Sequence, residues 1–450
     1  MIFIFLISLI QNFNTTSSSV KKQSNRYNRI NEKADPIYYI DRFFNNLGLL
    51  HPPHVYIINC TFQSNLGQGL YILYDTVLTI NTIDSCIFKN CSSEDRGAIY
   101  FRSEGPSHTT FTNCTFISNN CTRNGGAICF VSSNFTFSSC TFKDNSLLSP
   151  STTTASNTCR GGTACFQDSN GSLINCTFTN SQILSSLSSG NFFGGAIYTQ
   201  NSCQEYEKCV FIDCFSHSIL NQNRLNGGVF FTENSVCFIR DCNFTNNFVN
   251  SKGTDGESIG GAIASKTTNW TFEDCFFVNN TVYSNDNTCA GGALFFTNSN
   301  VEFLRTFFSL NSIQSSHEGS SCLGGAVFIQ NSIFIMNDCN IINNFIEPLV
   351  NNMVISGGGF YFVNSEGVIN GCFFISNSLK FASDMRGGCL LIMSSKVNMS
   401  DCVLSDNCIF CMSAYSTCLG GSLVSYNSDA FIYRCNFTNN SVLCPNYVCI

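Results

Sequence analysis

Residues 125–142 contain the stretch that decides the fold: Gly125-Gly126-Ala127-Ile128, followed by Cys140-Thr141-Phe142. The cysteine comes fifteen residues after the first glycine, and nine later copies keep this spacing. Those copies start at Gly161, Gly194, Gly227, Gly260, Gly291, Gly324, Gly357, Gly387 and Gly420. Their fifteenth residues are Cys176, Cys209, Cys242, Cys275, Thr306, Cys339, Cys372, Cys402 and Cys435. A spacing held through ten copies indicates a repeat protein whose units stack on one another.

The residues between these markers carry strand and turn patterns. Apolar residues two apart, such as Phe135 and Phe137, place both side chains on one face of a strand. An Asn-Ser pair such as Asn331-Ser332 recurs before this strand and suits a tight corner, because Asn tolerates left-handed backbone. The seventeenth residue after the first glycine is always apolar, and the twentieth is Asn except at Ser181 and Cys214. Each repeat therefore predicts about three short strands and three corners.

These features predict an all-β fold, a parallel β-helix (solenoid) of about thirteen coils. Like residues of successive coils stack in such a fold, so we expect Phe, Asn, small-residue and Cys ladders along the axis. The structural Cys ladder comprises Cys140, Cys176, Cys209, Cys242, Cys275, Cys339, Cys372, Cys402 and Cys435. A two-sheet sandwich is the alternative, but hairpins would not keep a fifteen-residue offset through ten copies.

The chain divides into four segments. Residues 1–15 contain an apolar run and predict a secretory signal peptide. Residues 16–55 form a polar leader or N-terminal cap, and residues 56–443 hold the repeats. Residues 444–450 form a tail that interrupts a coil, so we expect a truncated chain or a partner that caps the open β edge.

The amino-acid composition limits the class of binding partner and the cellular compartment. Charged residues make up 11% of the chain and the net charge is −7, which argues against nucleic-acid binding. The chain holds 28 cysteines without a paired metal-ligand motif. Such a count favours an oxidising, extracellular location.

The repeat resembles that of the chlamydial polymorphic outer membrane proteins, a signature also found in surface proteins of some parasitic protists. Gly-Gly-Ala-Ile stands at 125–128, 194–197 and 260–263. Phe-x-x-Asn stands at 62–65, 116–119, 244–247 and 437–440. The resemblance covers about residues 59–440 and implies a right-handed β-helix at the cell surface, used in adhesion or antigenic display. The bacterial members end in an autotransporter barrel, and that segment is not seen here.

Catalysis is the rival hypothesis, because β-helices also carry polysaccharide lyases and glycoside hydrolases. Asp241, Asp274 and Asp338 precede ladder positions, and stacked carboxylates would lie near the ~5 Å separation of a retaining glycosidase. Earlier coils have Asn or Ser at the same position, which fits a solvated turn. We therefore predict a non-enzyme without catalytic, cofactor or metal residues, including at Cys408-x-x-Cys411. A structural coat component is the second alternative.

Binding and covalent features complete the predictions. Cys289 and Cys322 share a repeat position in neighbouring coils, so we expect a disulfide between them. Asn59, Asn113 and Asn175 begin Asn-Cys-Thr glycosylation sequons. Three insertions are free in length and composition, and we interpret them as outside the repeat register: residues 181–193, 248–259 and 346–356. We expect such loops to bind a protein or glycan of a host or neighbouring cell surface.

Overall fold

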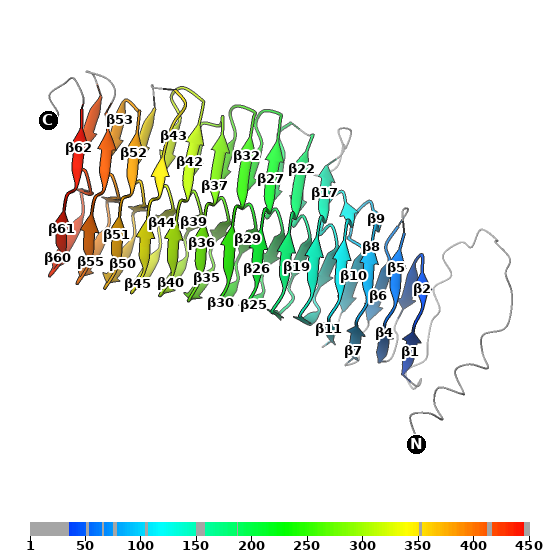
Figure 1. Cartoon of the computed structure of the whole chain (residues 1–450). Coiled ribbons are helices and arrows are strands. Elements are labelled where there is room, and N and C mark those ends of the chain that lie inside the picture. Colours follow the sequence, from blue (N-terminus) through cyan, green and yellow to red (C-terminus); the bar gives the residue numbers. More distant parts are fainter. Residues whose placement is uncertain are drawn as a thin grey trace, which may run out of the picture.

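In this computed structural model the described residues are 36–50, 54–64, 67–74, 79–103, 107–149, 158–186, 188–350, 353–411 and 416–444. The segment predicted as a signal peptide, residues 1–15, lies outside them, as do residues 445–450 of the predicted tail. Every regular element of the described residues is a β-strand, and all strand pairs are parallel in five long sheets (Figure 1). The predicted all-β parallel solenoid is confirmed.

Sheets A, B and C enclose the larger part of each coil. Sheet A consists of β3 (Leu47–Leu50), β6 (Leu70–Tyr74), β10 (Ile99–Ser103), β14 (Ile128–Val131), β19 (Ala164–Gln167), β24 (Ile197–Gln200), β29 (Phe230–Glu233), β34 (Ile263–Lys266), β39 (Leu294–Thr297), β44 (Val327–Gln330), β49 (Phe360–Val363), β54 (Leu390–Met393) and β59 (Leu423–Tyr426). Sheet B consists of β1 (Ile37–Ile40), β4 (Val55–Ile58), β7 (Thr79–Asp84), β11 (Ser107–Thr112), β15 (Asn134–Ser138), β20 (Gly171–Ile174), β25 (Cys203–Glu207), β30 (Val236–Arg240), β35 (Asn269–Glu273), β40 (Asn300–Leu304), β45 (Ile333–Asn337), β50 (Glu366–Asn370), β55 (Lys396–Ser400) and β60 (Asp429–Tyr433). Sheet C consists of β2 (Phe43–Phe44), β5 (Thr61–Gln63), β8 (Ile87–Lys89), β12 (Thr115–Ile117), β16 (Thr141–Lys143), β21 (Thr177–Thr179), β26 (Val210–Ile212), β31 (Asn243–Thr245), β36 (Phe276–Val278), β41 (Phe307–Ser309), β46 (Asn340–Ile342), β51 (Phe373–Ile375), β56 (Val403–Ser405) and β61 (Asn436–Thr438).

Sheets D and E form a second lobe. Sheet D consists of β9 (Ser92–Ser93), β13 (Asn120–Cys121), β17 (Ser146–Ser149), β22 (Gln182–Ser185), β27 (Phe215–Ser218), β32 (Phe248–Ser251), β37 (Thr281–Ser284), β42 (Ser312–Ser315), β47 (Phe345–Ile346), β52 (Ser378–Lys380), β57 (Cys408–Phe410) and β62 (Ser441–Leu443). Sheet E consists of β18 (Thr158–Arg160), β23 (Asn191–Phe193), β28 (Arg224–Asn226), β33 (Glu257–Ile259), β38 (Thr288–Ala290), β43 (Ser321–Leu323), β48 (Val354–Ser356), β53 (Asp384–Arg386) and β58 (Thr417–Leu419).

The second lobe corrects the prediction of three strands per coil. The insertions at 181–193, 248–259 and 346–356 are not free of register, because each contains residues of one sheet D strand and one sheet E strand. For example, Phe248 of β32 pairs with Thr281, and Glu257 of β33 pairs with Thr288. These strands have two to four residues, too few for a period-two pattern to be visible in the sequence. The unpaired loops therefore shrink to the turns between sheets D and E.

The number of coils also exceeds the prediction slightly. Sheets B and C each hold fourteen strands, whereas about thirteen coils were expected. The additional first coil is formed by β1, β2 and β3, within the segment assigned to the leader or N-terminal cap. Its strands pair in register with those of the next coil, for example Ile37 with Val55.

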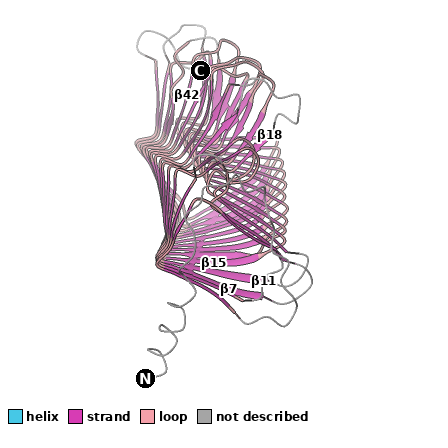
Figure 2. Ribbon diagram, turned by 90° about the vertical axis from the view of Figure 1, so that its right-hand side faces the viewer, coloured by secondary structure: helices cyan, strands magenta, loops and turns pink. Residues whose placement is uncertain are grey.

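Three apolar cores fill the two-lobed cross-section, which is visible end-on (Figure 2). The largest lies inside sheets A, B and C, where Phe rings stack along the axis, for example Phe142 on Phe178 with 4.3 Å between ring centroids. The expected Ala ladder is buried there as well: Ala127, Ala196, Ala262, Ala293 and Ala326. A second core lies between sheets D and E, in two separate stretches. A third lies between the outer face of sheet A and the ends of sheet E strands.

Residues in left-handed conformation form four corners in each complete coil. One coil illustrates them: Asn331 (φ 50) between sheets A and B, Asp338 (φ 53) between B and C, Asn343 (φ 56) between C and D, and Gly357 (φ 65) between E and A. Asn, Asp and Gly adopt this conformation at the lowest cost. The recurring Asn, Asp and Gly of the sequence are therefore corner residues.

The residue after each of three corners forms a ladder through its own N–H. Ser332 donates to Ser365 Oγ (3.2 Å), and Cys339 donates to Cys372 Sγ (3.4 Å). Asn311 donates to Asn344 Oδ1 (3.0 Å). Each acceptor belongs to the same position of the next coil. The predicted Asn ladder is confirmed, and the cysteines are hydrogen-bonding groups as well as small buried side chains.

At the fourth corner, between sheets E and A, a backbone carbonyl accepts the hydrogen bond in place of a side chain. The N–H of Gly292 donates to Gly324 O at 3.1 Å. A Cβ atom on Gly292 would lie 2.0 Å from Gly325 O and 2.6 Å from Ser312 O. The second glycine of each pair is therefore required by close approach of the neighbouring coil.

The last described coil differs from the others in exposure. Ile432 and Phe437 are 42% and 45% exposed, whereas Met399 and Leu404, their counterparts in the preceding coil, are buried. The predicted partner for this end stays a prediction.

The close approach at the second glycine predicts a large effect of Gly292→Ala. We expect a loss of at least about 3 kcal/mol in the free energy of unfolding, since the clashing atoms are backbone oxygens that cannot rotate away. Gly319→Ala is the matched control, because Gly319 has φ +78 but no atom within 4 Å of its Cβ position. The control should lose only about 1–2 kcal/mol. Urea denaturation of both variants measures the difference, and equal losses would contradict the prediction.

Candidate functional site

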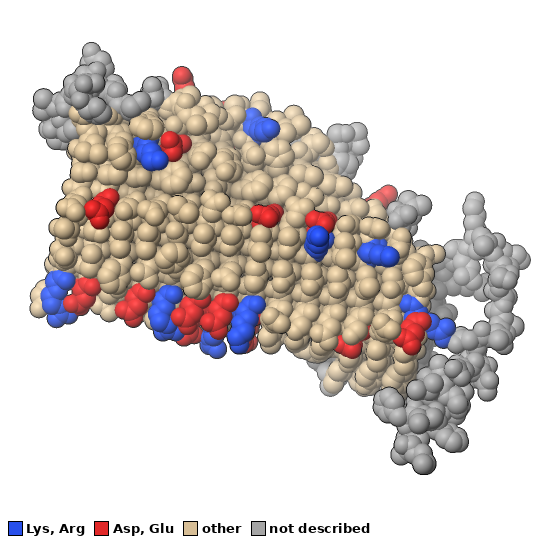
Figure 3. Space-filling model, viewed as in Figure 1, with Lys and Arg blue, Asp and Glu red and all other residues tan. Residues whose placement is uncertain are grey.

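Asp241, Asp274 and Asp338, the catalytic candidates of the rival hypothesis, belong to a row of residues at the corner between sheets B and C. Its members all have positive φ: Lys208, Asp241, Asp274, Arg305, Asp338, Gly371, Asp401 and Arg434. Asn59, Asn113 and Asn175 occupy the same corner in earlier coils. Charged side chains gather along this edge, below β30, β35 and β40 in the view of Figure 1 (Figure 3). The row is therefore set by a conformational requirement of the corner.

Arginines neutralise two of the four aspartates in this row, Asp274 and Asp401, and also the adjacent Glu273. Arg305 makes two hydrogen bonds to Asp274 (2.7 and 2.8 Å) and one to Glu273 (2.7 Å). Arg434 makes two to Asp401, both at 2.6 Å. These contacts lower the pKa of Asp274, Glu273 and Asp401. The three carboxyl groups are thus held ionised, whereas a general acid of a glycosidase needs a raised pKa.

Carboxyl groups with a raised pKa occur in the second lobe. Burial raises the pKa of Glu257 in β33, and burial also raises the pKa of Asp286 in the turn between β37 and β38. The Asp286 side chain is fully buried, so it cannot touch a polymeric substrate in this conformation. Glu257 and Asp286 belong to the second lobe, whereas Asp241, Asp274 and Asp338 lie at the corner between sheets B and C. The structure therefore does not bring the two groups of acids together.

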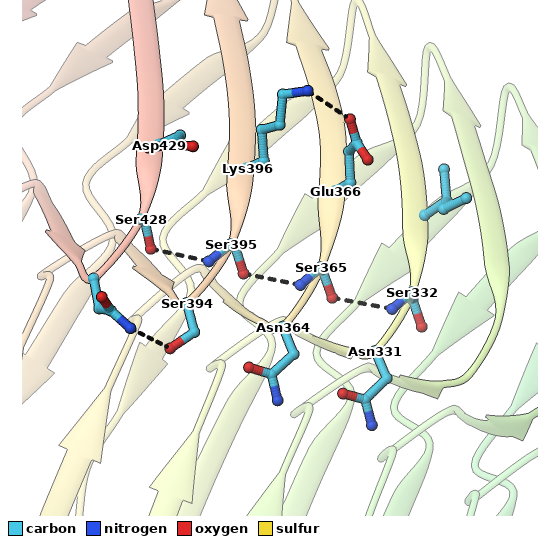
Figure 4. A pocket seen from close by; sticks show the side chains of 12 residues that line it. Asn331, Ser332, Asn364, Ser365, Glu366, Ser394, Ser395, Lys396, Ser428 and Asp429 are labelled. Atoms are coloured by element: carbon cyan, nitrogen blue, oxygen red, sulfur yellow. Dashed lines mark hydrogen bonds and ion pairs between the residues drawn. The ribbon is translucent and has the colours of Figure 1, made fainter.

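A polar groove of about 810 Å³ follows the corner between sheets A and B over four coils (Figure 4). Its floor is the Ser ladder, whose hydroxyls are fully used: Ser365 Oγ accepts from Ser332 N and donates to Val363 O (2.8 Å). The side chains of Asn331 and Asn364 point away from the floor. Glu366 and Lys396 form an exposed ion pair at 3.2 Å. The groove thus offers amide and charged groups on a rigid base.

The turns between sheets D and E form a second exposed surface. The turns that are described in full run from three residues, as at 285–287, to five residues, as at 219–223. Ile219 and Leu349 at these turns are 56% and 69% exposed. The strands on either side remain paired in register, so the turns vary on a fixed frame.

The structure does not form the predicted disulfide between Cys289 and Cys322. The two are register partners in β38 and β43, as expected, but both are free and buried. Side chains of paired residues in parallel strands point the same way, about 4.8 Å apart, whereas a disulfide needs a Cβ separation of about 3.5–4.5 Å. The stacking that suggested the bond therefore works against it.

A disulfide occurs instead at the C-terminal end of the second lobe. Cys411 is bonded to Cys418, with 6.7 Å between their Cα atoms. The sulfur of Cys444 lies within 4.8 Å of both, and Cys444 is also disulfide-bonded. These sulfurs are therefore already engaged, including Cys411 of the Cys408-x-x-Cys411 motif.

The three glycosylation candidates are exposed corner residues. Asn59 has φ 51 and donates to Asp41 Oδ1 at 2.6 Å, and Asn175 has φ 54 and donates to Ser139 Oγ at 3.2 Å. Asn113 has φ 52. Glycosylation at these positions stays a prediction.

The sequence reasoning missed a Ser ladder inside the second lobe. Each member follows the first glycine of its repeat by 24 residues, and all are buried: Ser149, Ser185, Ser218, Ser251, Ser284 and Ser315. Three of them bond to polar residues of the adjoining turns, namely Asn223, Asp286 and Ser320. The fixed spacing was a detectable signal, but it fell in segments interpreted as free insertions.

Comparison with known proteins identifies the architecture. A family model described as a right-handed β-helix region matches residues 48–277, more than half of the 450-residue chain. No curated protein matches the chain. Among solved structures, the chain is similar to the Streptococcus pneumoniae surface protein and adhesin PfbA at 9% identity. That similarity covers 87% of this chain and 91% of the other, with a TM-score of 0.29. Within the described residues no helix could span a membrane.

The disulfide pattern can be tested by peptide mapping under non-reducing conditions. Free thiols should be alkylated at acid pH during denaturation, so that exchange is suppressed. We expect a peptide that links Cys411 to Cys418, and alkylated Cys289 and Cys322. A peptide that links Cys289 to Cys322 would contradict the structure.

The charged row predicts a small effect of the triple substitution Asp241→Asn, Asp274→Asn and Asp338→Asn. Asn also tolerates the left-handed corner, and only exposed charge is lost, so we expect a change of no more than about 1 kcal/mol in the free energy of unfolding. Urea denaturation measures it. A loss well above this value would show that the carboxylates have a further role.

Proposed function

Because this chain belongs to the family of right-handed β-helix proteins, we propose that it is an extracellular, surface-associated protein of adhesion or antigenic display. In this proposal the chain binds a protein or glycan of a host or neighbouring cell and performs no chemistry of its own. The Gly-Gly-Ala-Ile and Phe-x-x-Asn repeats support it through their resemblance to those of chlamydial polymorphic outer membrane proteins.

The main support comes from the turns between sheets D and E. Their lengths differ from coil to coil, for example between 252–256 and 285–287, while the flanking strands β32, β33, β37 and β38 stay in register. Recognition requires surface groups that can vary without loss of the fold, and such turns meet this requirement. The exposed apolar side chains Ile219, Leu220 and Leu349 add contact area that a solvated turn does not need.

The groove at the corner of sheets A and B provides a second contact surface. Its free groups recur once per coil, at Asn331 and Asn364, and its Ser ladder holds the spacing. An extended partner lying along the axis would meet similar groups at intervals of about 4.8 Å. The groove and the turns lie on separate corners of the coil.

A secreted carbohydrate-active enzyme is the rival, and a structural coat component is a further alternative. The rival would need an exposed pair of carboxyl groups, one of them with a raised pKa. Glu273 and Asp274, paired with Arg305, have lowered pKa values, and their arrangement fits a charged corner better.

Replacing Ile219–Gln222 with Gly-Ser-Gly-Ser tests the proposal. Asn223 is kept, because its Nδ2 anchors the turn to Ser218. We expect an unchanged fold, since turn composition contributes little to the free energy of unfolding. Beads coated with the full chain should adhere to cultured epithelial cells at least about threefold less after the replacement, because exposed contact groups are lost.

The triple Asp→Asn variant is the control and should adhere like the unchanged chain. Cleavage of a polysaccharide panel is measured for both variants. The proposal fails if the unchanged chain adheres no better than albumin, or if the Asp variant loses a cleavage activity that the turn variant retains.

A further inference from the structure

Asp286 places a carboxyl group inside the second lobe. Its Oδ1 accepts from the Gly256 N–H at 3.2 Å, and its Oδ2 accepts from the hydroxyls of Ser258 (2.7 Å) and Ser284 (3.1 Å). All of these donors are neutral. Among the described residues, no ion pair includes Asp286. A fully buried carboxylate without a counter-charge is unfavourable, so the site calls for a cation or a proton.

The charged groups around Asp286 are two acids and two bases, Asp255 and Glu257 with Arg224 and Lys252. Glu257 lies close enough to be affected: burial raises its pKa, Arg224 lowers it, and Asp286 raises it. Asp255 is exposed on the same turn as Gly256. The cationic groups on the neighbouring elements are Arg224 and Lys252, and both are exposed. These four charges balance, so Asp286 leaves the region with one net negative charge, which favours a cation.

Hydroxyl groups interrupt the apolar core of the second lobe at this coil. Val249 and Val282 pair in register on the sheet D side, so the interruption lies on the sheet E side. There Ser258 occupies the position that holds Leu225 in one neighbouring coil and Cys289 in the other. A buried Ser at this otherwise apolar position needs a polar partner, which Asp286 supplies.

The hydroxyl of Ser251 can accept a further ligand. Its side chain is buried and its Oγ has no hydrogen-bond partner. Burial raises the pKa of Asp286, and Ser251 lies close enough to act against this shift as a hydrogen-bonding group, although the contact does not reach ordinary hydrogen-bond geometry. A buried hydroxyl without a partner is unfavourable unless it binds something.

We propose that Asp286 and the hydroxyls of Ser251, Ser258 and Ser284 form a binding site for a hard cation, Ca²⁺ or Na⁺. Such ions prefer carboxylate and other oxygen ligands. Ca²⁺ binds these oxygens at about 2.3–2.6 Å, so neighbouring ligand oxygens lie roughly 3 Å apart. The contacts of Oδ2 with the two hydroxyls have this spacing. Hydroxyls can turn their lone pairs toward the ion, and one carboxylate supplies the charge.

Binding of the ion at this site would stabilise the turns at 252–256 and 285–287. Gly256 donates to Asp286 from one turn, and Asp286 belongs to the other. A bound cation would hold both turns to the end of sheet D through Ser251 and Ser284. The inference concerns the stability of this region and does not depend on adhesion.

Hydrogen exchange of the full chain tests the site. Backbone amides of residues 252–259 and 284–290 are followed at neutral pH with about 10 mM CaCl₂, with NaCl, and with choline chloride at matched ionic strength. For a site of about millimolar affinity, we expect Ca²⁺ or Na⁺ to slow exchange about tenfold relative to choline. The Ca²⁺ and Na⁺ arms identify the ion.

Two variants and one control make the result specific. Asp286→Asn should abolish the slowing, and Ser251→Ala should weaken it while leaving the fold intact. Asp241→Asn removes the same charge from an exposed corner and should keep the full response. The proposal is overturned if neither ion slows exchange in the unchanged chain, or if Ser251→Ala and Asp241→Asn respond alike. A dependence on pH without a dependence on either ion would assign a proton to Asp286 instead.

Discussion

The whole structure depends on a hydrogen-bond acceptor for the backbone N–H of the residue that follows each corner. A left-handed residue turns the chain, and the next N–H then points along the axis, where no strand of its own coil can accept it. A buried N–H without a partner costs about 1–3 kcal/mol, and such corners recur in nearly every coil. Side chains of the next coil provide the acceptor: Ser365 Oγ, Cys372 Sγ and Asn344 Oδ1. Each of these side chains also donates, for example Ser365 to Val363 O and Cys372 to Asn370 O. The corners therefore select residues that can donate and accept at the same time, which are Ser, Cys and Asn.

This constraint separates structural from functional positions. The ladder cysteines are explained by the corner hydrogen bonds and do not require a role in thiol chemistry. The aspartates between sheets B and C are explained by their left-handed conformation and do not require a role as acids. Gly371 holds the same corner with no side chain, which shows that the position does not depend on a carboxylate. In the proposed function, binding groups belong to surfaces that the ladders do not specify. These are the outward amides of Asn331 and Asn364 and the turns between sheets D and E.

The second lobe follows the same stacking but with a less uniform interior. Its core is interrupted on the sheet E side at Ser258, and the groups at the interruption are hydroxyls and one carboxyl group. Such a polar interior contributes less to stability than an apolar one unless all of its groups are satisfied. It does, however, tie the exposed turns to the frame, since Asn223, Asp286 and Ser320 each contact a buried Ser. Turns held in this way can present their outer residues in one geometry.

The sequence by itself determined the parallel solenoid, the Phe, Ala, Cys and Asn ladders, and the Asn-Ser corner. It could do so because residues of equal position contact one another in a stacked fold, so the repeat period is a direct record of contacts. It did not determine the number of sheets, because strands of two to four residues in sheets D and E carry no visible period. It placed Cys289 beside Cys322 correctly, yet only the side-chain direction in paired parallel strands decided that they stay unbonded. It also gave no sign of the buried site at Asp286, because that site joins two turns of neighbouring coils whose contact arises only when the second lobe closes.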